Sequence, residues 1–294
     1  MKYIKLFEQF IAESGNSVED AKPFQQDQVK PTLDWIKKNV FPVIGLTDFG
    51  DDAAVIGSAG KKAPGDASGD IDIAVSADKI AGHLDASLQN VLEVLDDRLK
   101  SSGFDTKLAR GFNQVSIGAP IAGDPRNGVG QVDLMLSTDM DWSRFIYHSP
   151  DFSKGESKYK GAYRNMLLMS AIGQSFGKTL EKTPEGQTVT YQAYVIRLNQ
   201  GIIEIRKSFM GKKGLVKTAK LLREYDREIT REPQEVVNLL FNGNHTPQDI
   251  DSYEKLKSLI DSSAFKFPNK VKGIMDEFKS RVEISGLPLP SDIA

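Results

Sequence analysis

Residues 57–73 read GSAGKKAPGDASGDIDI, and this stretch decides how the first half of the chain folds. Its last four residues alternate acids with isoleucines, which is the period of a β-strand that has one buried face. The residues before them are rich in glycine and lysine and predict a loop. A strand would place Asp70 and Asp72 on one face and turn the isoleucines into the core.

Two carboxylates on one strand face repel each other, so they need a cation or an exposed surface. A third acid, Asp133, lies in GQVDLML, another apolar strand pattern. Three such acids can hold two Mg²⁺ (or Mn²⁺) ions, because these cations prefer oxygen ligands. Two ions about 4 Å apart polarise the phosphates of a nucleotide and activate an attacking hydroxyl. The alternative interpretation is an exposed acidic strand edge beside a solvated loop.

The loop before the acidic pair has the composition of a phosphate-binding segment. Gly57 would let the backbone approach a phosphate, and the Ser58 hydroxyl would donate a hydrogen bond to it. Lys61 and Lys62 would neutralise the charge of a triphosphate. The sequence therefore predicts that this loop and the acids form one metal-dependent nucleotide site.

Two other Asp-x-Asp tripeptides serve as internal controls. Asp139 and Asp141 follow the strand pattern QVDLMLS and mark its exit into a turn. Asp249 and Asp251 precede SYEKLKSLI, where Asp251 or Ser252 would cap a helix. We expect structural roles for both tripeptides, because one marks the end of a strand and the other precedes a helix.

The patterns around the site predict an α+β fold with two parts. Residues 30–148 would form a catalytic domain, a mixed β-sheet with helices on one side. Residues 150–290 would form a mainly helical region that binds the acceptor or the nucleotide and contains a β-hairpin at 188–209. We expect one helix that begins near Pro31 and another over 83–101. Strands are expected at 53–57, at 70–76 and around Asp133. Amphipathic helices would follow Gly214, the first with Leu215, Ala219 and Leu222.

The composition restricts the chemistry. The chain has 294 residues, a net charge of −2 and no cysteine, which excludes disulfides, thiolate zinc sites and cysteine nucleophiles. Its three histidines, His83, His148 and His245, are far apart in the chain and are expected to be structural. The sequence has no run of about 18 apolar residues, so we expect no membrane partner.

At the acids and their loop, the sequence resembles the nucleotidyltransferase superfamily that contains DNA polymerase β, the CCA-adding enzymes, the poly(A) polymerases and small bacterial transferases. The pattern of that family is Gly-Ser, a short loop, Asp-x-Asp on a strand, and a third Asp on a later strand. Here Gly57 and Ser58 open the pattern. Eleven residues separate Ser58 from Asp70, and Asp133 suits the third position. The resemblance covers about residues 35 to 140.

This resemblance implies a metal-dependent transfer of a nucleoside monophosphate from a nucleoside triphosphate to a hydroxyl acceptor. Asp70 and Asp72 would bind metal, and Asp133 would bind metal and help to activate the acceptor. One departure is Gly69, where relatives often have Ser directly before the first Asp; Ser68 is displaced by one position. This difference affects the expected contacts with phosphate more than the expected binding of metal.

The amino terminus carries a second resemblance. Residues 1–13, MKYIKLFEQFIAE, are similar to the capsid-targeting peptides of internal head proteins in T-even-like tailed phages. The match lies in Phe10 to Glu13 and implies cleavage before Ser14 by a phage prohead protease. It also implies packaging in the virion interior and delivery to the bacterial host cytoplasm. The alternative is a short amphipathic helix at the start of an ordinary cytoplasmic protein.

Basic residues that follow the acids indicate an acceptor. The segment SKGESKYKGAYRN places Lys160 and Arg164 near two tyrosines, and basic residues recur over 206–223. Such a tract could contact the backbone of RNA while the rings stack on unpaired bases. We therefore expect an RNA acceptor, with the 3′ end of a tRNA as one candidate. A solvated helix face is the alternative interpretation of the same charges.

Three other functions fit parts of the sequence. The acceptor could be a protein or a small molecule instead of RNA. Gly173 to Thr179, GQSFGKT, resembles the Walker phosphate loop of an ATPase, although it is one residue short and follows a helix pattern. A transferase fold without activity could also serve as a non-enzymatic internal head protein.

Overall fold

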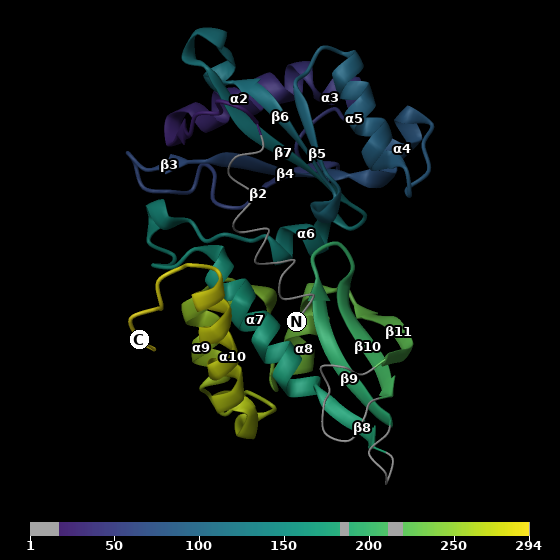
Figure 1. Ribbon diagram of the computed structural model, residues 1–294. Helices are drawn as coiled ribbons and strands as arrows, with labels where there is room; N and C mark the ends of the chain where they lie inside the picture. Colours follow the sequence, from purple (N-terminus) through teal and green to yellow (C-terminus); the bar gives the residue numbers. More distant parts are fainter. Residues whose placement is uncertain (1–17, 183–187, 211–219, 294) are drawn as a thin grey trace. The chain divides into compact units, whose positions relative to one another are not determined.

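The computed structural model describes residues 18–182, 188–210 and 220–293 (Figure 1). The chain divides into two compact units, Met1–Ala162 with Glu283–Ala294, and Tyr163–Val282. Each unit is described separately below. Among the described helices, none is long and apolar enough to cross a membrane.

Several predicted features lie outside the described residues. These are the capsid-targeting peptide at 1–13 with the cleavage point before Ser14, and the Leu215 and Ala219 positions of a predicted helix. Part of the basic tract at 206–223 also lies there.

The described part of the first unit is built on a five-stranded mixed sheet (Figure 1). Its strands lie in the order β2 (Ala53–Ile56), β4 (Asp70–Ser76), β7 (Val129–Ser137), β6 (Gln114–Pro120) and β5 (Thr106–Ala109). β4 and β7 are parallel, and the other neighbouring strands are antiparallel. The predicted mixed sheet is confirmed, and the two strands that carry the three acids are adjacent.

Helices cover one face of this sheet, as predicted (Figure 1). They are α2 (Gln26–Asn39), α3 (Phe41–Ile44), α4 (Ala77–Leu84) and α5 (Val91–Ser101). Ile71 and Ile73 of β4 are fully buried in the core between the sheet and these helices. The short helix α6 (Met140–Ile146) also contacts β2 and β4. Its Met140 packs with Ala74 and Met135, which alternation places on the opposite face of the sheet.

Two helices differ from their predicted bounds. α2 begins before Pro31, because Gln25 and Gln28 form a capping box that satisfies the first backbone groups of the helix. The helix predicted at 83–101 is two helices, since Asp85 takes a left-handed conformation (φ 51°) and ends α4. The spacing of leucines identified the buried face of α5 but not this break.

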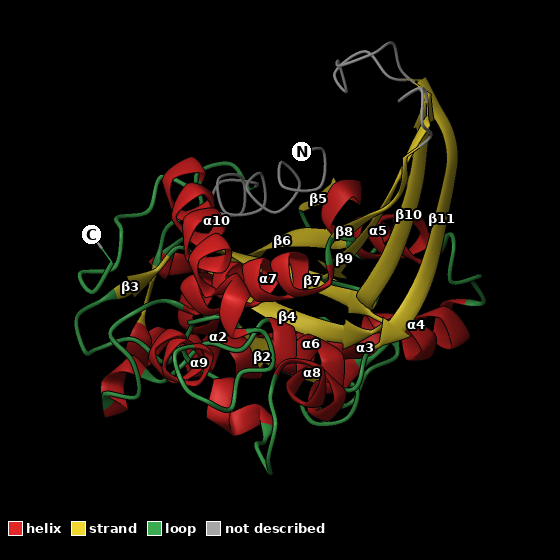
Figure 2. Ribbon diagram, turned by 90° about the horizontal axis from the view of Figure 1, so that it is seen from below, coloured by secondary structure: helices red, strands yellow, loops and turns green. Residues whose placement is uncertain are grey.

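The described part of the second unit combines helices with an antiparallel sheet (Figures 1 and 2). The sheet has the order β11 (Lys220–Thr230), β10 (Gly201–Met210), β9 (Thr188–Arg197) and β8 (Lys178–Lys182). The helices are α7 (Gly161–Phe176), α8 (Pro233–Leu240), α9 (Tyr253–Ile260) and α10 (Val271–Ile284). β9 and β10 form the predicted hairpin, and Figure 2 shows that β10 and β11 are long and curved.

Two predictions in this unit are wrong. Leu222 was expected in a helix, but it lies in β11, which pairs with β10. The apolar spacing there also fits a helix, and pairing with the hairpin decides in favour of a strand. The interpretation of GQSFGKT as an ATPase phosphate loop is wrong, because Gly173 to Phe176 form the last turn of α7. Such a loop requires irregular backbone between a strand and a helix.

The control tripeptides have the expected structural roles. Asp139 accepts a hydrogen bond from a backbone N–H of α6 at 2.9 Å and caps that helix. Ser252 accepts one from a backbone N–H of α9 at 3.3 Å. Asp249 accepts from the Thr246 N–H at 2.8 Å in a capping box. The side chains of Asp139, Asp249 and Ser252 therefore hydrogen-bond backbone groups at the starts of helices.

Candidate metal centre

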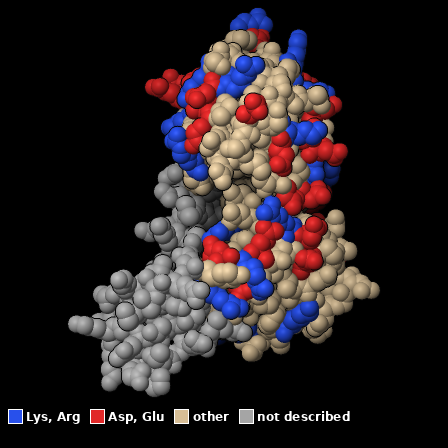
Figure 3. Space-filling model, turned by 90° about the vertical axis from the view of Figure 1, so that its right-hand side faces the viewer, with Lys and Arg blue, Asp and Glu red and all other residues tan. Residues whose placement is uncertain are grey.

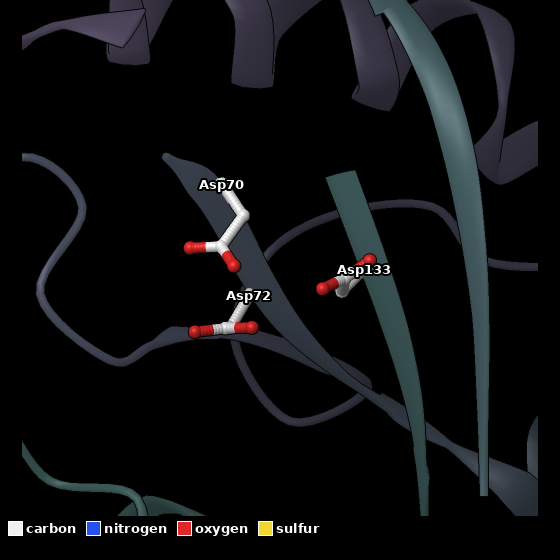
Figure 4. A group of neighbouring side chains, drawn as sticks. All are labelled: Asp70, Asp72 and Asp133. Carbon is white, nitrogen blue, oxygen red and sulfur yellow. The ribbon is translucent and has the colours of Figure 1, made fainter. Parts of the chain in front are cut away.

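The three predicted acids lie together on the face of the sheet that is opposite α2 to α5. In the parallel pair of β4 and β7, Asp72 lies directly beside Asp133, and Asp70 lies beside Gln131. One carboxylate oxygen from each of Asp70, Asp72 and Asp133 lies within 4.8 Å of the other two. Figure 4 shows the three carboxylates pointing toward one another from neighbouring strands. Strand pairing therefore brings together acids that are far apart in the sequence.

Burial raises the pKa of all three carboxyls. For Asp133, which is fully buried, burial raises the pKa to about 7, and the charge of Asp70 adds to the shift. Burial, Asp70 and Asp133 raise the pKa of Asp72 well above its usual value. Burial also raises the pKa of Asp70, although the Lys62 charge opposes this.

The donor set fits a hard divalent cation. Carboxylate oxygens are the ligands that Mg²⁺ or Mn²⁺ prefers in proteins. Asp70, Asp72 and Asp133 provide three such groups at close range, and a bound cation would remove their mutual repulsion. These residues would hold the metal from two adjacent strands.

Sequence patterns did not indicate the polar residues around Asp133. Gln131 Nε2 donates to Oδ1 and Oδ2 of Asp133 at 3.0 and 3.1 Å. Ser116 and Gln114 of β6 also hydrogen-bond this carboxyl. The only signal in the sequence is the repeated Gln-Val-x in GQVDLML and NQVSIGA, which places each Gln on the same strand face as the Asp or Ser two residues later.

Gly57 lies directly against Asp72. Strand β2 ends at Ile56, the pairing partner of Asp72, so the loop begins beside the acids. Gly57 has a left-handed backbone (φ 69°), and a Cβ at this position would lie 2.6 Å from Oδ2 of Asp72. The missing side chain therefore makes room for the Asp72 carboxylate, a role that the sequence did not predict. Ser58 is partly exposed, and its hydroxyl makes no hydrogen bond within the described residues.

The two lysines of the loop have different surroundings. Lys62 Nζ donates to the Ala67 carbonyl at 2.6 Å, and its charge interacts with that of Asp70. Lys61 Nζ donates to the Ser149 carbonyl at 3.0 Å. Burial lowers the pKa of both lysines. Lys62 is thus a loop lysine beside the acids, whereas Lys61 joins the loop to the segment that contains Ser149.

The two predicted acceptor contacts also differ. Lys160 is exposed, and its charge interacts with that of Lys62. Arg164 is fully buried in the second unit, where Nε donates to the Ile250 carbonyl and Nη1 to Oδ1 of Asn165, both at 2.9 Å. Burial lowers the pKa of Arg164 to about 9. This position differs from the expected phosphate contact, because a buried guanidinium is not on a surface that RNA reaches.

Comparisons with known proteins give weak structural likenesses. No protein-family model matches the chain, and no curated protein matches it. The chain is similar to the structure of a cytoplasmic RNA terminal U-transferase, with 15% identity and a TM-score of 0.27, over 58% of this chain and 48% of that chain. It is also similar to the Cid1 poly(U) polymerase bound to MgGTP, with 14% identity and a TM-score of 0.27, over 63% of this chain and 64% of that chain. A structure of Cid1 in complex with its short product ApU matches at 14% identity and a TM-score of 0.24, over 64% of each chain.

The match thus spans 48% to 64% of the length of these solved structures. Both names describe enzymes that add nucleotides. TM-scores this low carry no argument about function, so the assignment of an activity depends on the geometry of the acids.

Proposed function

We propose that this protein is a metal-dependent nucleotidyltransferase, which transfers a nucleoside monophosphate from a nucleoside triphosphate to a hydroxyl acceptor. The supporting observation is that Asp70, Asp72 and Asp133 meet on one sheet face, beside the turn at Gly57. Their oxygens match Mg²⁺ or Mn²⁺. Residues 30–148 would then be the catalytic domain.

The three carboxylates have separate tasks in this reaction. Asp70 and Asp72 would hold metal from one strand, and Asp133 from the next. When bound, two such ions polarise the phosphates and lower the pKa of the acceptor hydroxyl. The acceptor oxygen bonds to the α-phosphorus, and the bond from this phosphorus to pyrophosphate breaks. Asp133 would help to activate the acceptor by taking the proton that the hydroxyl loses.

The loop residues and Lys160 would hold the triphosphate. Lys62 interacts with both Asp70 and Lys160, so a second positive charge lies near the lysine that borders the acids. Two lysines that repel each other favour an anion between them. Ser58 offers its hydroxyl at the start of the same loop. We assign Lys61 a supporting contact, because its Nζ already donates to a carbonyl of the protein.

RNA is the acceptor that we favour, and the 3′ end of a tRNA is one candidate. Lys158 and Lys160 are exposed on either side of Tyr159, which suits a phosphate backbone with an unpaired base. On the face drawn in Figure 3, basic and acidic side chains are interspersed. Binding would therefore depend on local groups of this kind, and residues 150–290 would contribute to the acceptor or nucleotide site. A protein or a small molecule is the alternative acceptor.

The test supplies each of the labelled triphosphates, with Mg²⁺ or Mn²⁺, together with total RNA, protein or small molecules. Label in RNA is the expected result, whereas label only in another pool would reject the RNA acceptor and keep the activity. Asp70→Asn combined with Asp72→Asn should abolish transfer and leave the circular dichroism spectrum unchanged. The matched control, Asp249→Asn with Asp251→Asn, alters the same tripeptide and should retain transfer. Unchanged transfer in the first double variant would overturn the proposal.

Packaging in a phage head is a separate proposal that rests on the resemblance of residues 1–13. Exposure to a phage prohead protease should remove these residues and leave Ser14 as the amino terminus, which mass spectrometry would show. A chain that stays intact would reject it. A non-enzymatic internal head protein would be processed in the same way but would transfer no nucleotide.

A further inference from the structure

A buried polar network connects Asp133 to the beginning of the described chain. Gln131 and Asp133 are both fully buried, and Gln131 Nε2 donates to both carboxylate oxygens. A buried amide is stable when both of its ends have partners. The oxygen end of Gln131 accepts a hydrogen bond from the backbone N–H of Val18, with a distance of 3.1 Å to Oε1.

Val18 fixes the direction in which the Gln131 amide points. A backbone N–H can only donate, so it requires the amide oxygen and leaves the amide NH₂ facing Asp133. With the amide reversed, its oxygen would face the carboxylate oxygens, and its NH₂ would face another N–H. Both of those contacts would be repulsive. The Val18 N–H therefore selects the orientation in which Gln131 donates to Asp133.

The segment 18–26, which we call the brace, is anchored against β7. The Lys22 N–H donates to the Val129 carbonyl at 2.8 Å. Phe24 is fully buried, and its ring occupies the space that a Cβ on Gly130 would need. The glycine therefore allows the ring to lie directly on the strand that carries Gln131 and Asp133. These contacts hold the Val18 N–H at a fixed place beside the strand.

The same brace also reaches the loop that leads to Asp70. Its strand β1 (Phe24–Gln25) pairs with β3 (Ala67–Ser68), which ends two residues before Asp70. Gln26 Nε2 donates to a carbonyl of that loop at 3.0 Å, and its Oε1 accepts from the Lys62 N–H at 3.1 Å. The brace thus contacts β7 ahead of Asp133 and also the loop that leads into β4.

We propose that Gln131 is a positioning residue of the metal centre and that the brace sets the orientation of its amide. This role rests on the proposed function, which identifies the acids as a metal site. It extends that site to Gln131 and to the brace, which lie outside the acidic motif. One donor shared by both oxygens holds the plane of the Asp133 carboxylate before a cation binds. Loss of a partner of this kind lowers metal affinity by about 10- to 100-fold in other metal sites.

Binding of Mn²⁺ to the full chain without nucleotide, followed by electron paramagnetic resonance, tests this role apart from activity. Gln131→Met keeps the volume and removes the two hydrogen bonds to Asp133 and the one from the Val18 N–H, so we expect Mn²⁺ affinity to fall by about tenfold or more. Gln174→Met is the matched control. In the second unit, Gln174 Nε2 donates to Oε2 of Glu277 at 2.7 Å, so the same amide-to-carboxylate bond is lost away from the acids. Its Mn²⁺ affinity should equal that of the unaltered chain.

A second pair of variants tests the brace without touching Gln131. Val18→Pro removes the backbone N–H, whereas Val18→Ala keeps it and removes only side-chain atoms. We expect Val18→Pro to weaken Mn²⁺ binding in the same direction as Gln131→Met, and Val18→Ala to bind as the unaltered chain does. This pair also decides the matter if Gln131→Met does not fold.

The outcomes separate this inference from the proposed function. Unaltered Mn²⁺ affinity in Gln131→Met, or equal affinities in the two Val18 variants, overturns the inference alone. Absence of Mn²⁺ binding in the unaltered chain, or binding that survives Asp70→Asn with Asp72→Asn, overturns the metal centre and the inference with it.

Discussion

The two units each bury carboxylates, and their charges are neutralised in different ways. In the second unit, Glu204 is fully buried and accepts from Arg206 Nε at 2.6 Å and from Arg227 Nη2 at 2.5 Å. Burial would raise the pKa of Glu204, but these hydrogen bonds outweigh it and hold the pKa below its usual value. In the first unit, burial and neighbouring aspartates raise the pKa of Asp72 and Asp133.

This difference distinguishes a structural acid, Glu204, from the acids of the proposed metal centre. Glu204 receives its cations from the chain itself, so its ionised form is stable in the protein alone. The acids on β4 and β7 repel one another and can be relieved by a cation from solution. An arrangement that destabilises the metal-free protein is typical of functional sites.

Glu204→Gln alters the structural side of the comparison and should have the largest effect on stability. The variant removes the charge that holds Arg206 and Arg227, so the free energy of unfolding should fall by roughly 1–2 kcal/mol. The loss is limited because both arginines are about half exposed and remain hydrated. Urea unfolding would measure it. In the control Glu228→Gln, at an exposed ion pair, the loss should stay below about 0.5 kcal/mol.

The pH dependence of stability probes the functional side. The pKa of Asp133 is about 7 in the folded protein, against an ordinary value of 3.8. Between these values the folded protein keeps a proton that the unfolded chain has lost. The free energy of unfolding of the metal-free protein should therefore fall as the pH rises from about 4 to 7.

Denaturant unfolding at several pH values, with and without Mg²⁺, checks this dependence. Mg²⁺ should reduce the loss at pH 7 and above, because the cation takes the place of the proton. Asp133→Asn should remove this part of the pH dependence. Glu204 contributes with the opposite sign, since its lowered pKa gives stability that is lost as the pH falls. An unchanged pH profile in Asp133→Asn would contradict a raised pKa for this carboxyl.

The smallest expected effect is a difference in stability between two glycine variants, one of which lies at the turn beside the acids. Gly57→Ala and Gly65→Ala both place a side chain on a left-handed backbone, at a cost of about 1 kcal/mol each. At Gly65 nothing lies within 4 Å of the added Cβ, whereas at Gly57 the Cβ meets Oδ2 of Asp72. That oxygen can rotate away, so thermal unfolding should hardly distinguish the variants. Mn²⁺ affinity should fall in Gly57→Ala alone, and equal affinities would show that the contact does not position Asp72.

The acids could be identified from the sequence because local patterns encode their strands. Asp70 and Asp72 alternate with isoleucines, and Asp133 interrupts an apolar strand, so each position is visible within a few residues. The role of Gln131 was not visible. It depends on a strand register and on Val18, which lies 113 residues away in the chain.

Charge and periodicity misled the prediction where packing decides the structure. Arg164 lies in a basic segment and was expected at the surface, but its guanidinium bonds a backbone carbonyl inside the second unit. Leu222 fits a helical spacing, but its segment pairs with β10 at the edge of the β9–β10 hairpin and is therefore a strand. Neither the burial of Arg164 nor the pairing of β11 with the hairpin can be predicted from the neighbouring residues in the sequence.

Asp72 and Asp133 sit side by side although sixty residues lie between them in the chain. Pairing of β4 with β7, and not the length of the connection, sets their separation. The crossing could lengthen or shorten with little effect on the acids, whereas one residue inserted in β7 ahead of Asp133 would turn its carboxylate toward the helix-covered core. Variation is thus tolerated in the connections and excluded within two short strands.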